Sequence, residues 1–389
     1  MKNLISLVVI INILLIIGSC TKYSDSKEII KEQLKEGVLR IAAMNINEVP
    51  ITVTSYQCDR SAGGIHDFYS EGDYWWPNEL DPEGPYVQRD GQTNRNNFVS
   101  HRHAMIRFSE IVANLTSAYT LTKDKKYIEA ALSHVRAWFM DEHTKMNPNL
   151  LYAQAIKGVT TGRGIGIIDT IHLIEVIQSL LQMELWGVLS QEDILGTKEW
   201  VSAYLQWLTT HPNGLKEMNA KNNHGTCWVM QVAMFAKYTS NDTILQLCVD
   251  RYKNILLPDQ MAEDGSFPRE LNRTKPYGYS LFNLDAMSTL CYILSTDNEN
   301  LWAYTTDDGK NMQKGIDFML PFVIDKSLWE YTPDVMYWDE WPIAQPFLFF
   351  GSIGLNNIEY IKVWKSLEHF PTNDEVVRNL PIRNPLIWL

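Results

Sequence analysis

The sequence has few cysteines, no excess of basic residues and almost no alternating strand pattern. Five cysteines in 389 residues, without a metal-binding spacing, exclude a disulfide scaffold. Lys and Arg number 34 against 46 Asp and Glu, which gives a net charge of −12, so the chain lacks the basic face that a nucleic-acid partner requires. No linker rich in Pro, Gly or Ser divides the chain, which favours one domain. The cysteines beyond residue 20 are expected to be buried free thiols: Cys58, Cys227, Cys248 and Cys291.

The first twenty residues differ from the rest of the chain. Lys2 precedes an apolar run from Leu4 to Ile17, which is typical of a secretory signal and too short for an ordinary membrane-spanning helix. The ending at Cys20 resembles a bacterial lipobox, in which the cysteine becomes the lipidated first residue of the mature chain. We therefore expect an exported protein that is lipid-anchored in the cell envelope, either in the periplasm or at the cell surface. Its only expected contact with the membrane is the lipid anchor. The expected segments are a lipoprotein signal peptide (1–20), a polar tether (21–30) and a folded domain (31–389).

Apolar residues recur with the helical period through most of the folded domain. Residues 106–118 and 127–138 form one predicted helical hairpin, and the best strand candidate is 51–54. Because amphipathic helix pairs bury their apolar faces when they surround a common centre, we predict a single all-α domain with antiparallel helix pairs around a ring. The further predicted pairs are 168–185 with 200–208, 227–238 with 243–257, and 281–294 with 312–323.

The connections 61–91, 144–166 and 260–279 are long and rich in Gly, Asn, Arg and aromatic residues, as loops that carry a site often are. The strongest motif, Lys221 to Trp228, brings Asn222, Asn223 and His224 to the start of a predicted helix. The free N–H groups of a helix N-terminus favour an anion, so this cluster is suited to a carboxylate. The alternative is that an asparagine merely caps the helix and His224 is a structural first-turn residue.

A second motif, residues 264–280, crowds three cations and two tyrosines in front of a predicted helix. The alternative is a solvated basic turn in which Glu270 pairs with Arg269 or Arg273. Together, His224, Arg273 and Tyr279 suit removal of the C5 proton of a uronic acid, followed by loss of the 4-linked oxygen. Donors such as Asn223 and His224 would neutralise the carboxylate as charge develops on it. A cation such as Arg273 would favour the phenolate of Tyr279, which would act as base and then as acid.

In these motifs the sequence resembles the alginate lyase family of helical-toroid polysaccharide lyases, especially its Bacteroidetes branch. The resemblance spans Ser61 to Cys291. It implies an incomplete (α/α) toroid of about six to seven helical hairpins, β-elimination without a cofactor or metal, and catalytic roles for Asn223, His224, Arg273 and Tyr279. In the better-known members the Arg-to-Tyr interval is one residue longer, which leaves Tyr277 as an alternative; Tyr279 is preferred because Ser280-Leu281 follow it. The matching stretches are 72–77, 89–91, 146–154, 162–169, 222–225, 264–271, 273–274 and 279–281.

Other residues of the matching stretches are candidates for binding the sugar chain, or else anchors of the loops. Trp75 and Trp76 offer stacking faces, and Tyr277 would form a wall of the cleft. Asp90 and Asp169 are expected to be structural partners of arginines. Residues 337–342 form an aromatic loop that either closes the cleft or packs against the last hairpin. The polar candidates are Arg89 and Arg163 for neighbouring carboxylates, and Asn149 and Gln154 for hydroxyls.

The expected partner is an acidic polysaccharide, with mannuronate-rich alginate first and glucuronan as the alternative substrate of the same mechanism. A glycoside hydrolase on the same ring would need two carboxylates across the bond, for which Asp264 and Glu270 are the nearest candidates. A non-catalytic glycan-binding lipoprotein would use the aromatic loops alone. The sequence carries no prediction of the oligomeric state.

The lipid anchor gives the first testable prediction. Cys20→Ala should abolish metabolic labelling with a fatty acid and release the protein from the membrane fraction, because the acyl chains on Cys20 supply the membrane affinity. A Cys58→Ala variant should be labelled normally. Continued labelling of Cys20→Ala would contradict the prediction.

Overall fold

The computed structural model describes residues 26–389, so the predicted signal peptide, Cys20 and residues 21–25 of the predicted tether lie outside the described residues. The long helices are α2 (Ser100–Thr122), α3 (Lys126–Phe139), α4 (Leu173–Leu185), α5 (Gln191–Thr210), α7 (Asn223–Tyr238), α8 (Asp242–Arg251), α11 (Pro276–Leu294), α12 (Met312–Ile324), α13 (Pro346–Gly354) and α14 (Ile358–Lys365). Shorter helices are α6 (Pro212–Met218), α9 (Leu257–Gln260), α10 (Pro268–Leu271) and α15 (Asp374–Arg378). Helical turns are η1 (Val53–Ser55), η2 (Gly164–Thr170), η3 (Tyr252–Leu256), η4 (Lys326–Leu328), η5 (Trp338–Glu340) and η6 (Pro385–Trp388).

The long helices form an inner and an outer row, as in an (α/α) toroid. In the inner row α2 packs against α4, α4 against α7, α7 against α11, and α11 against α13. Each inner helix is followed in the chain by an outer one, namely α3, α5, α8, α12 and α14. Three of the four predicted pairs pack together, namely α2 with α3, α7 with α8 and α11 with α12, whereas α5 packs against α7, α6 and α3 rather than against α4. Residues 26–389 contain five such pairs, fewer than the six to seven expected. The predicted all-α fold class is confirmed.

The two rows differ in burial because only the inner helices are surrounded on all sides. Almost every residue of α7 and α11 is buried, including polar ones, whereas α5 and α8 bury one face. Side-chain caps define where outer helices begin: the hydroxyl of Ser190 accepts from Asp193 N at α5, and Asn311 accepts from Lys314 N at α12. The inner helices are thus positioned by packing, whereas all the outer helices except α3 begin at a side-chain cap.

A helix over residues 26–45 precedes the first pair and overlaps the predicted tether. Its apolar residues Ile30, Leu34, Val38 and Ala42 recur every four positions and are all buried. The Ser26 hydroxyl lies 2.9 Å from the Ser352 hydroxyl in α13, and the Val38 carbonyl accepts from Asn114 in α2. This helix therefore bridges the last and first inner helices, and the folded domain begins before the predicted boundary at residue 31.

The C-terminal segment lies against the inner row, with η6 in contact with α2 and α4. Gln178 Nε2 in α4 donates to the carbonyl of Ile387 at 2.8 Å, and the Tyr292 hydroxyl in α11 donates to the carbonyl of Trp388. The indole of Trp388 is buried edge-on against Phe350 in α13. One short segment thereby ties three inner helices together.

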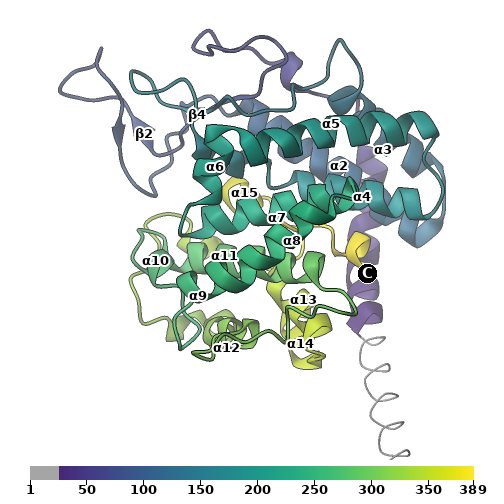
Figure 1. Cartoon of the computed structure of the whole chain (residues 1–389), viewed down its shortest axis with the longest axis vertical. Coiled ribbons are helices and arrows are strands. Elements are labelled where there is room, and N and C mark those ends of the chain that lie inside the picture. The colour runs from purple at the N-terminus through teal and green to yellow at the C-terminus, as the bar shows by residue number, and fades with distance from the viewer. Residues whose placement is uncertain (1–25) are drawn as a thin grey trace, which may run out of the picture.

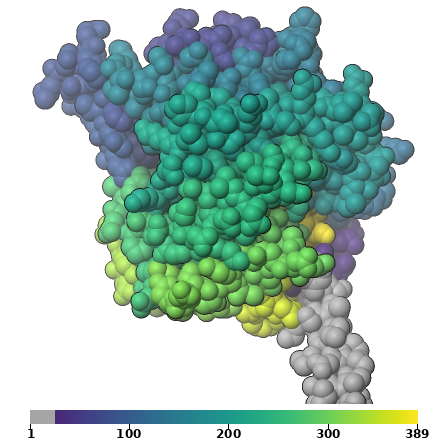
Figure 2. Space-filling view, viewed as in Figure 1, coloured from purple at the N-terminus to yellow at the C-terminus, as the bar shows by residue number. Residues whose placement is uncertain are grey.

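Short strands and long loops gather at the end of the ring where α2, α7 and α11 begin. β1 (Tyr69–Glu71) pairs in parallel with β4 (Tyr152–Ala155), and β2 (Trp75–Trp76) pairs antiparallel with β3 (Val87–Gln88). The strand predicted at 51–54 is wrong, because this stretch leads into the turn η1, which the Thr52 side chain caps. The segment that carries β2 and β3 projects beyond the helices (Figures 1 and 2).

Within residues 26–389 no single helix is long and apolar enough to cross a membrane; the bent pair η2 and α4 meets the criterion only by length and composition. Most residues of that pair are buried in the ring. Of the cysteines beyond residue 20, all are free; Cys227, Cys248 and Cys291 are buried as predicted, and Cys58 is half-buried.

The C-terminal contact gives a prediction about stability. Trp388→Ala should lower the free energy of unfolding by about 3–5 kcal/mol, because it leaves a cavity among three inner helices. Leu80→Ala, at a side chain that is 96% exposed, should leave stability unchanged. Urea unfolding measures both, and equal stability of the two variants would show that the C-terminal segment does not tie the ring together.

Candidate active site

A cleft of about 600 Å³, partly open to solvent, lies where the projecting loops meet the starts of α7 and α11. The two motifs of the sequence therefore face each other across one space, together with a segment from α15 at the far end of the chain. The lining residues are Asp73, Tyr74, Trp75, Gln88, Gln154, Arg163, Ile165, Ile168, Asn223, His224, Arg273, Tyr279, Phe282, Arg378 and Asn379. All four predicted catalytic residues are among them.

Asn223 is the first residue of α7, and Asn222 holds the capping position without a side-chain capping bond. The group that caps this helix is the buried carboxylate of Glu270, which accepts from Asn223 N at 2.7 Å and from Asn223 Nδ2 at 2.8 Å. Burial raises the pKa of Glu270 although these two bonds oppose the shift. The helix N-terminus thus already holds a protein carboxylate, so the backbone anion site expected from the sequence is occupied by Glu270.

His224 follows in the first turn of α7, with its ring partly exposed to the cleft. Its Nδ1 atom lies 2.5 Å from Oε1 of Glu217, near the end of α6. No group within the described chain hydrogen-bonds to Nε2, the other ring nitrogen. His224 is therefore held from one side and has a free nitrogen for a ligand.

Tyr279 lies in the first turn of α11, so it belongs to a helix rather than to the long loop predicted for 260–279. Its hydroxyl lies 2.7 Å from the Tyr74 hydroxyl, and the guanidinium carbon of Arg273 lies 4.6 Å from its ring centroid. Burial, and then Tyr74, raise the pKa of Tyr279 well above 10, and Arg273 offsets only part of this rise. The sequence argument had the direction of the Arg273 effect right but missed the larger effect of burial.

Arg273 is oriented by Asp90, which accepts from Nη2 at 2.8 Å and from Nε at 3.2 Å. Asp90 is therefore the partner of an arginine, as predicted, although of one far away in the sequence. Arg269 instead donates to the carbonyls of Lys221 and Asp259, so the alternative in which Glu270 pairs with a neighbouring arginine is wrong.

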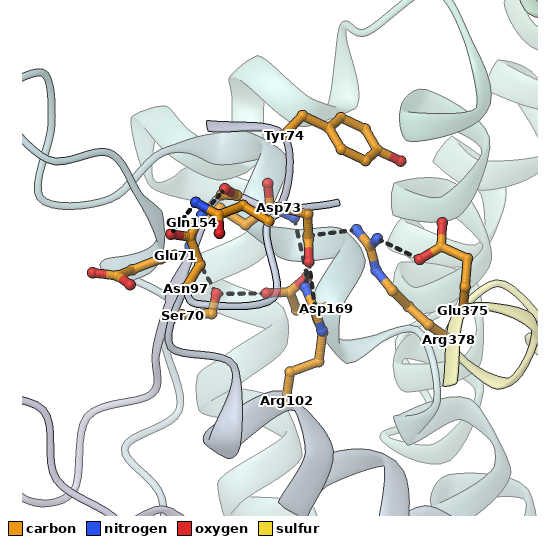
Figure 3. Close-up of polar contacts among 12 residues, drawn as sticks. Ser70, Glu71, Asp73, Tyr74, Asn97, Arg102, Gln154, Asp169, Glu375 and Arg378 are labelled. Carbon is orange, nitrogen blue, oxygen red and sulfur yellow. Dashed lines mark hydrogen bonds and ion pairs between the residues drawn. The ribbon is translucent and has the colours of Figure 1, made fainter. Parts of the chain in front are cut away.

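A buried ion network supports the floor of the cleft (Figure 3). Asp73 pairs with Arg102 at 2.6 Å and with Arg378 at 2.9 Å, and Arg102 also reaches Asp169 at 3.4 Å. Burial alone would raise the pKa of Asp73, but Arg102 and Arg378 outweigh it and hold this pKa below its usual range. The network joins the loop after β1, the first turn of α2, and α15.

A second buried pair continues the network towards Tyr279. Glu375 in α15 accepts from Lys275 Nζ at 2.5 Å and from Arg378 at 3.3 Å. Lys275 Nζ lies 5.1 Å from the Tyr74 ring centroid and 5.4 Å from that of Tyr279. A cation thus lies beside both phenols of the hydroxyl pair.

Three of the seven predicted substrate-binding residues line the cleft, namely Trp75, Gln154 and Arg163. Arg163 donates to the Gln154 side chain at 3.0 Å, and its guanidinium carbon lies 5.7 Å from the Trp75 ring centroid. Gln154 in turn donates to Asp169 at 3.1 Å, which connects these residues to the buried network.

The other four predicted binding residues do not line the cleft. Tyr277 and Tyr279 are two residues apart on a helix, so they point in different directions. Tyr277 is fully buried, and its hydroxyl donates to the carbonyl of Phe322. The prediction that it forms a cleft wall is therefore wrong. Arg89 pairs with Glu79 and lies 5.2 Å from the Trp76 ring centroid on the projecting hairpin, and Asn149 accepts from Leu151 N.

Sequence reasoning missed several lining residues. Gln88, Arg378 and Asn379 carry no motif, and Arg378 and Asn379 lie almost a hundred residues beyond the last matching stretch. Tyr74 lies within the matching stretch 72–77, but its contact with Tyr279 was not predicted. Pro276 begins α11, so helical spacing could have shown that Tyr277 and Tyr279 point in different directions.

The carboxylates do not fit a glycoside hydrolase. Asp73 is the only Asp or Glu that lines the cleft among residues 26–389, and it is held by two arginines. Both oxygens of Glu270 accept from Asn223, and Asp264 is not in the cleft. The described chain also has no group of three or more His, Cys, Asp or Glu side chains suited to a metal.

Comparison with known proteins agrees with this geometry. The model of the family described as alginate lyase matches residues 52–329. A solved alginate lyase from Bacteroides ovatus is 30% identical, covers 95% of this chain and 97% of its own, and superposes with a TM-score of 0.80. The chain belongs to the alginate lyase family. It is therefore a polysaccharide lyase whose substrate is an acidic polysaccharide, as the resemblance implied.

More distant solved structures share the fold of this lyase. Alginate lyase A1-III from Sphingomonas species A1 is 14% identical, with 87% of this chain and 88% of that chain covered and a TM-score of 0.53. A variant of A1-III complexed with a tetrasaccharide is 13% identical, with 88% of each chain covered and a TM-score of 0.57. No match was found among curated proteins.

The buried network predicts how the lyase responds to loss of one charge. Arg102→Ala should lower the free energy of unfolding by about 3–5 kcal/mol, because Asp73 and Asp169 would lose a buried cation. Arg95→Ala, at an exposed arginine of the preceding loop, should leave it unchanged. Chemical denaturation distinguishes the two variants, and an Arg102→Ala protein as stable as wild type would mean that the network does not hold the loop on the ring.

Proposed function

We propose that this lyase cleaves alginate, with a preference for mannuronate-rich chains, by β-elimination that leaves an unsaturated uronide. The observation that carries the proposal is the placement of Tyr279 in one cleft with Asn223, His224 and Arg273. A phenol thus faces carboxylate-binding donors across a cleft that is partly open to solvent. The family supports alginate as the polymer.

The first task of the site is to neutralise the uronate carboxylate. The C5 proton is weakly acidic beside an ionised carboxylate, so donors must accept the charge that moves onto that group. The free Nε2 of His224 and the second amide proton of Asn223 are the donors, because Glu217 contacts Nδ1 of His224 and Glu270 accepts the other amide proton of Asn223. Both donors are fixed before the substrate arrives.

Tyr279 then carries both proton transfers on one face of the mannuronate ring. Its phenolate takes the C5 proton, the C5–H electrons form the C4–C5 double bond, and the C4–O4 bond breaks. The Tyr279 phenol returns its proton to the leaving oxygen, which restores the phenolate. Arg273 and Lys275 beside the ring favour the phenolate. At guluronate the C5 proton lies on the opposite face, where His224 would have to act as base.

We also propose that the protein is exported and anchored through a lipid on Cys20. Residue 26 lies beside Ser352 in the last turn of α13, whereas the cleft lies at the first turns of α7 and α11. An anchor that leaves the domain at residue 26 would keep the cleft away from the membrane. This arrangement supports a lipoprotein that acts on soluble polymer.

A panel of polymers tests the activity. Polymannuronate, polyguluronate and glucuronan are incubated with the protein, and absorbance of the unsaturated product is measured together with new reducing ends. The proposal predicts both signals, with the highest rate on polymannuronate. Reducing ends without the absorbance would indicate a hydrolase, and neither signal on any polymer would indicate a binding protein.

The role of the phenol gives a sharper prediction. Tyr279→Phe should retain the fold and bind the polymer but lose nearly all elimination, because only the hydroxyl is removed. Tyr277→Phe is the matched control and should keep near wild-type activity, since its hydroxyl lies outside the cleft. Product absorbance and the thermal midpoint are measured for both variants. A Tyr279→Phe enzyme with near wild-type turnover would overturn the assignment.

The raised pKa of Tyr279 predicts the pH dependence. Since the phenolate is the base, the rate should increase with pH on the acid side of the profile. Removing the Arg273 charge removes the cation that lowers this pKa, so Arg273→Ala should move that side of the profile to higher pH. The profile of Arg95→Ala should coincide with that of wild type. An unshifted profile for Arg273→Ala would contradict the role of the cation.

A further inference from the structure

We propose that Glu217 is the positioning residue of the catalytic histidine: it accepts the Nδ1 proton of His224 and thereby directs Nε2 to the substrate carboxylate. The role of Nε2 in binding the substrate carboxylate rests on the proposed function. The orientation of the ring rests only on its contact with Glu217. It identifies a pair of residues, Glu217 and His224, that sequence reasoning did not join.

The geometry of the pair is specific. Glu217 lies near the end of α6, and its side chain is 3% exposed. Its Oε1 atom lies 2.5 Å from Nδ1 of His224, and among residues 26–389 no Lys or Arg forms an ion pair with it. A buried carboxylate without a basic partner is costly, so its hydrogen bond to a cleft residue points to function rather than stability.

The chemistry of the two groups fixes the ring. An ionised carboxylate only accepts hydrogen bonds, so the proton of this bond must be on Nδ1. That leaves Nε2, the atom without a partner in the described chain, for the cleft. The arrangement matches the way a buried carboxylate orients a catalytic histidine in hydrolase triads, where it sets the tautomer and holds the imidazolium.

Substrate binding completes the pair. A uronate carboxylate at Nε2 needs a proton on that nitrogen too, so the bound ring is an imidazolium between two carboxylates. Five charged or titratable groups face the His224 ring: Glu217 from α6, Glu270 from α10, Arg273, Tyr279 from α11, and Arg163 from the loop before η2. Arg273 is paired with Asp90, and Glu270 bonds Asn223; among residues 26–389 only Glu217 hydrogen-bonds to the ring.

The direct test is the tautomer of His224. The protein is labelled with ¹⁵N-histidine, and the ring signals of His224 are identified among nine histidines by comparison with His224→Gln. With a neutral ring the inference predicts the proton on Nδ1 in wild type, and redistribution towards Nε2 in Glu217→Gln. A wild-type ring protonated on Nε2, or an unchanged tautomer in Glu217→Gln, would overturn it. If Glu217→Gln does not fold, the wild-type spectrum decides alone.

Kinetics give a second readout. Glu217→Gln should lose about 10²–10⁴-fold in kcat with a smaller change in KM, and Glu217→Asp should recover part of this loss because it keeps the carboxylate. Glu175→Gln, at a buried glutamate that contacts Arg383 and Asn384, is the matched control and should keep wild-type rates. Equal rates for Glu217→Gln and wild type would overturn the inference. If no form cleaves a uronate polymer, the proposed function fails, while the tautomer still decides the role of Glu217.

Discussion

Three of the donors and cations that surround the cleft are held by carboxylates that do not line it. Glu270 holds Asn223, Glu217 holds His224, and Asp90 holds Arg273. A site for an acidic polymer needs positive and donor groups, which repel one another and would otherwise turn to solvent. Partner carboxylates remove the repulsion and fix the geometry, so that the groups need no reorganisation when charge develops on the substrate. Glu217 comes from α6, Glu270 from α10, and Asp90 from the loop after β3.

The helical ring makes that delivery possible because inner helices α2, α7 and α11 begin at the same end. Their first turns carry Arg102, Asn223 and Tyr279, and their dipoles place positive potential towards the cleft. The same arrangement buries Tyr279, which raises the pKa of its phenol. Burial and Tyr74 thus make the phenolate of Tyr279 harder to form, and Arg273 offsets part of this effect.

Much of this was predictable from the sequence, since helical periodicity identified the paired helices and two motifs identified the four central residues. The helix over residues 26–45 was missed because its polar start was taken as a tether, although the four-residue spacing from Ile30 to Ala42 is visible in the sequence. Tyr277 was misplaced because helix phase was not applied to the start of α11. Glu217 and Arg378 were not predictable, because each acts through a contact that only the folded chain creates.

The most direct test of the central claim, that the polymer is cleaved by removal of the C5 proton, uses polymannuronate deuterated at C5. Elimination predicts a primary isotope effect on the chemical step and loss of one C5 deuterium for every bond cleaved, because C5 becomes part of the double bond. The products are counted by mass spectrometry. Cleavage that retains every C5 deuterium would contradict the mechanism, whichever residues line the cleft.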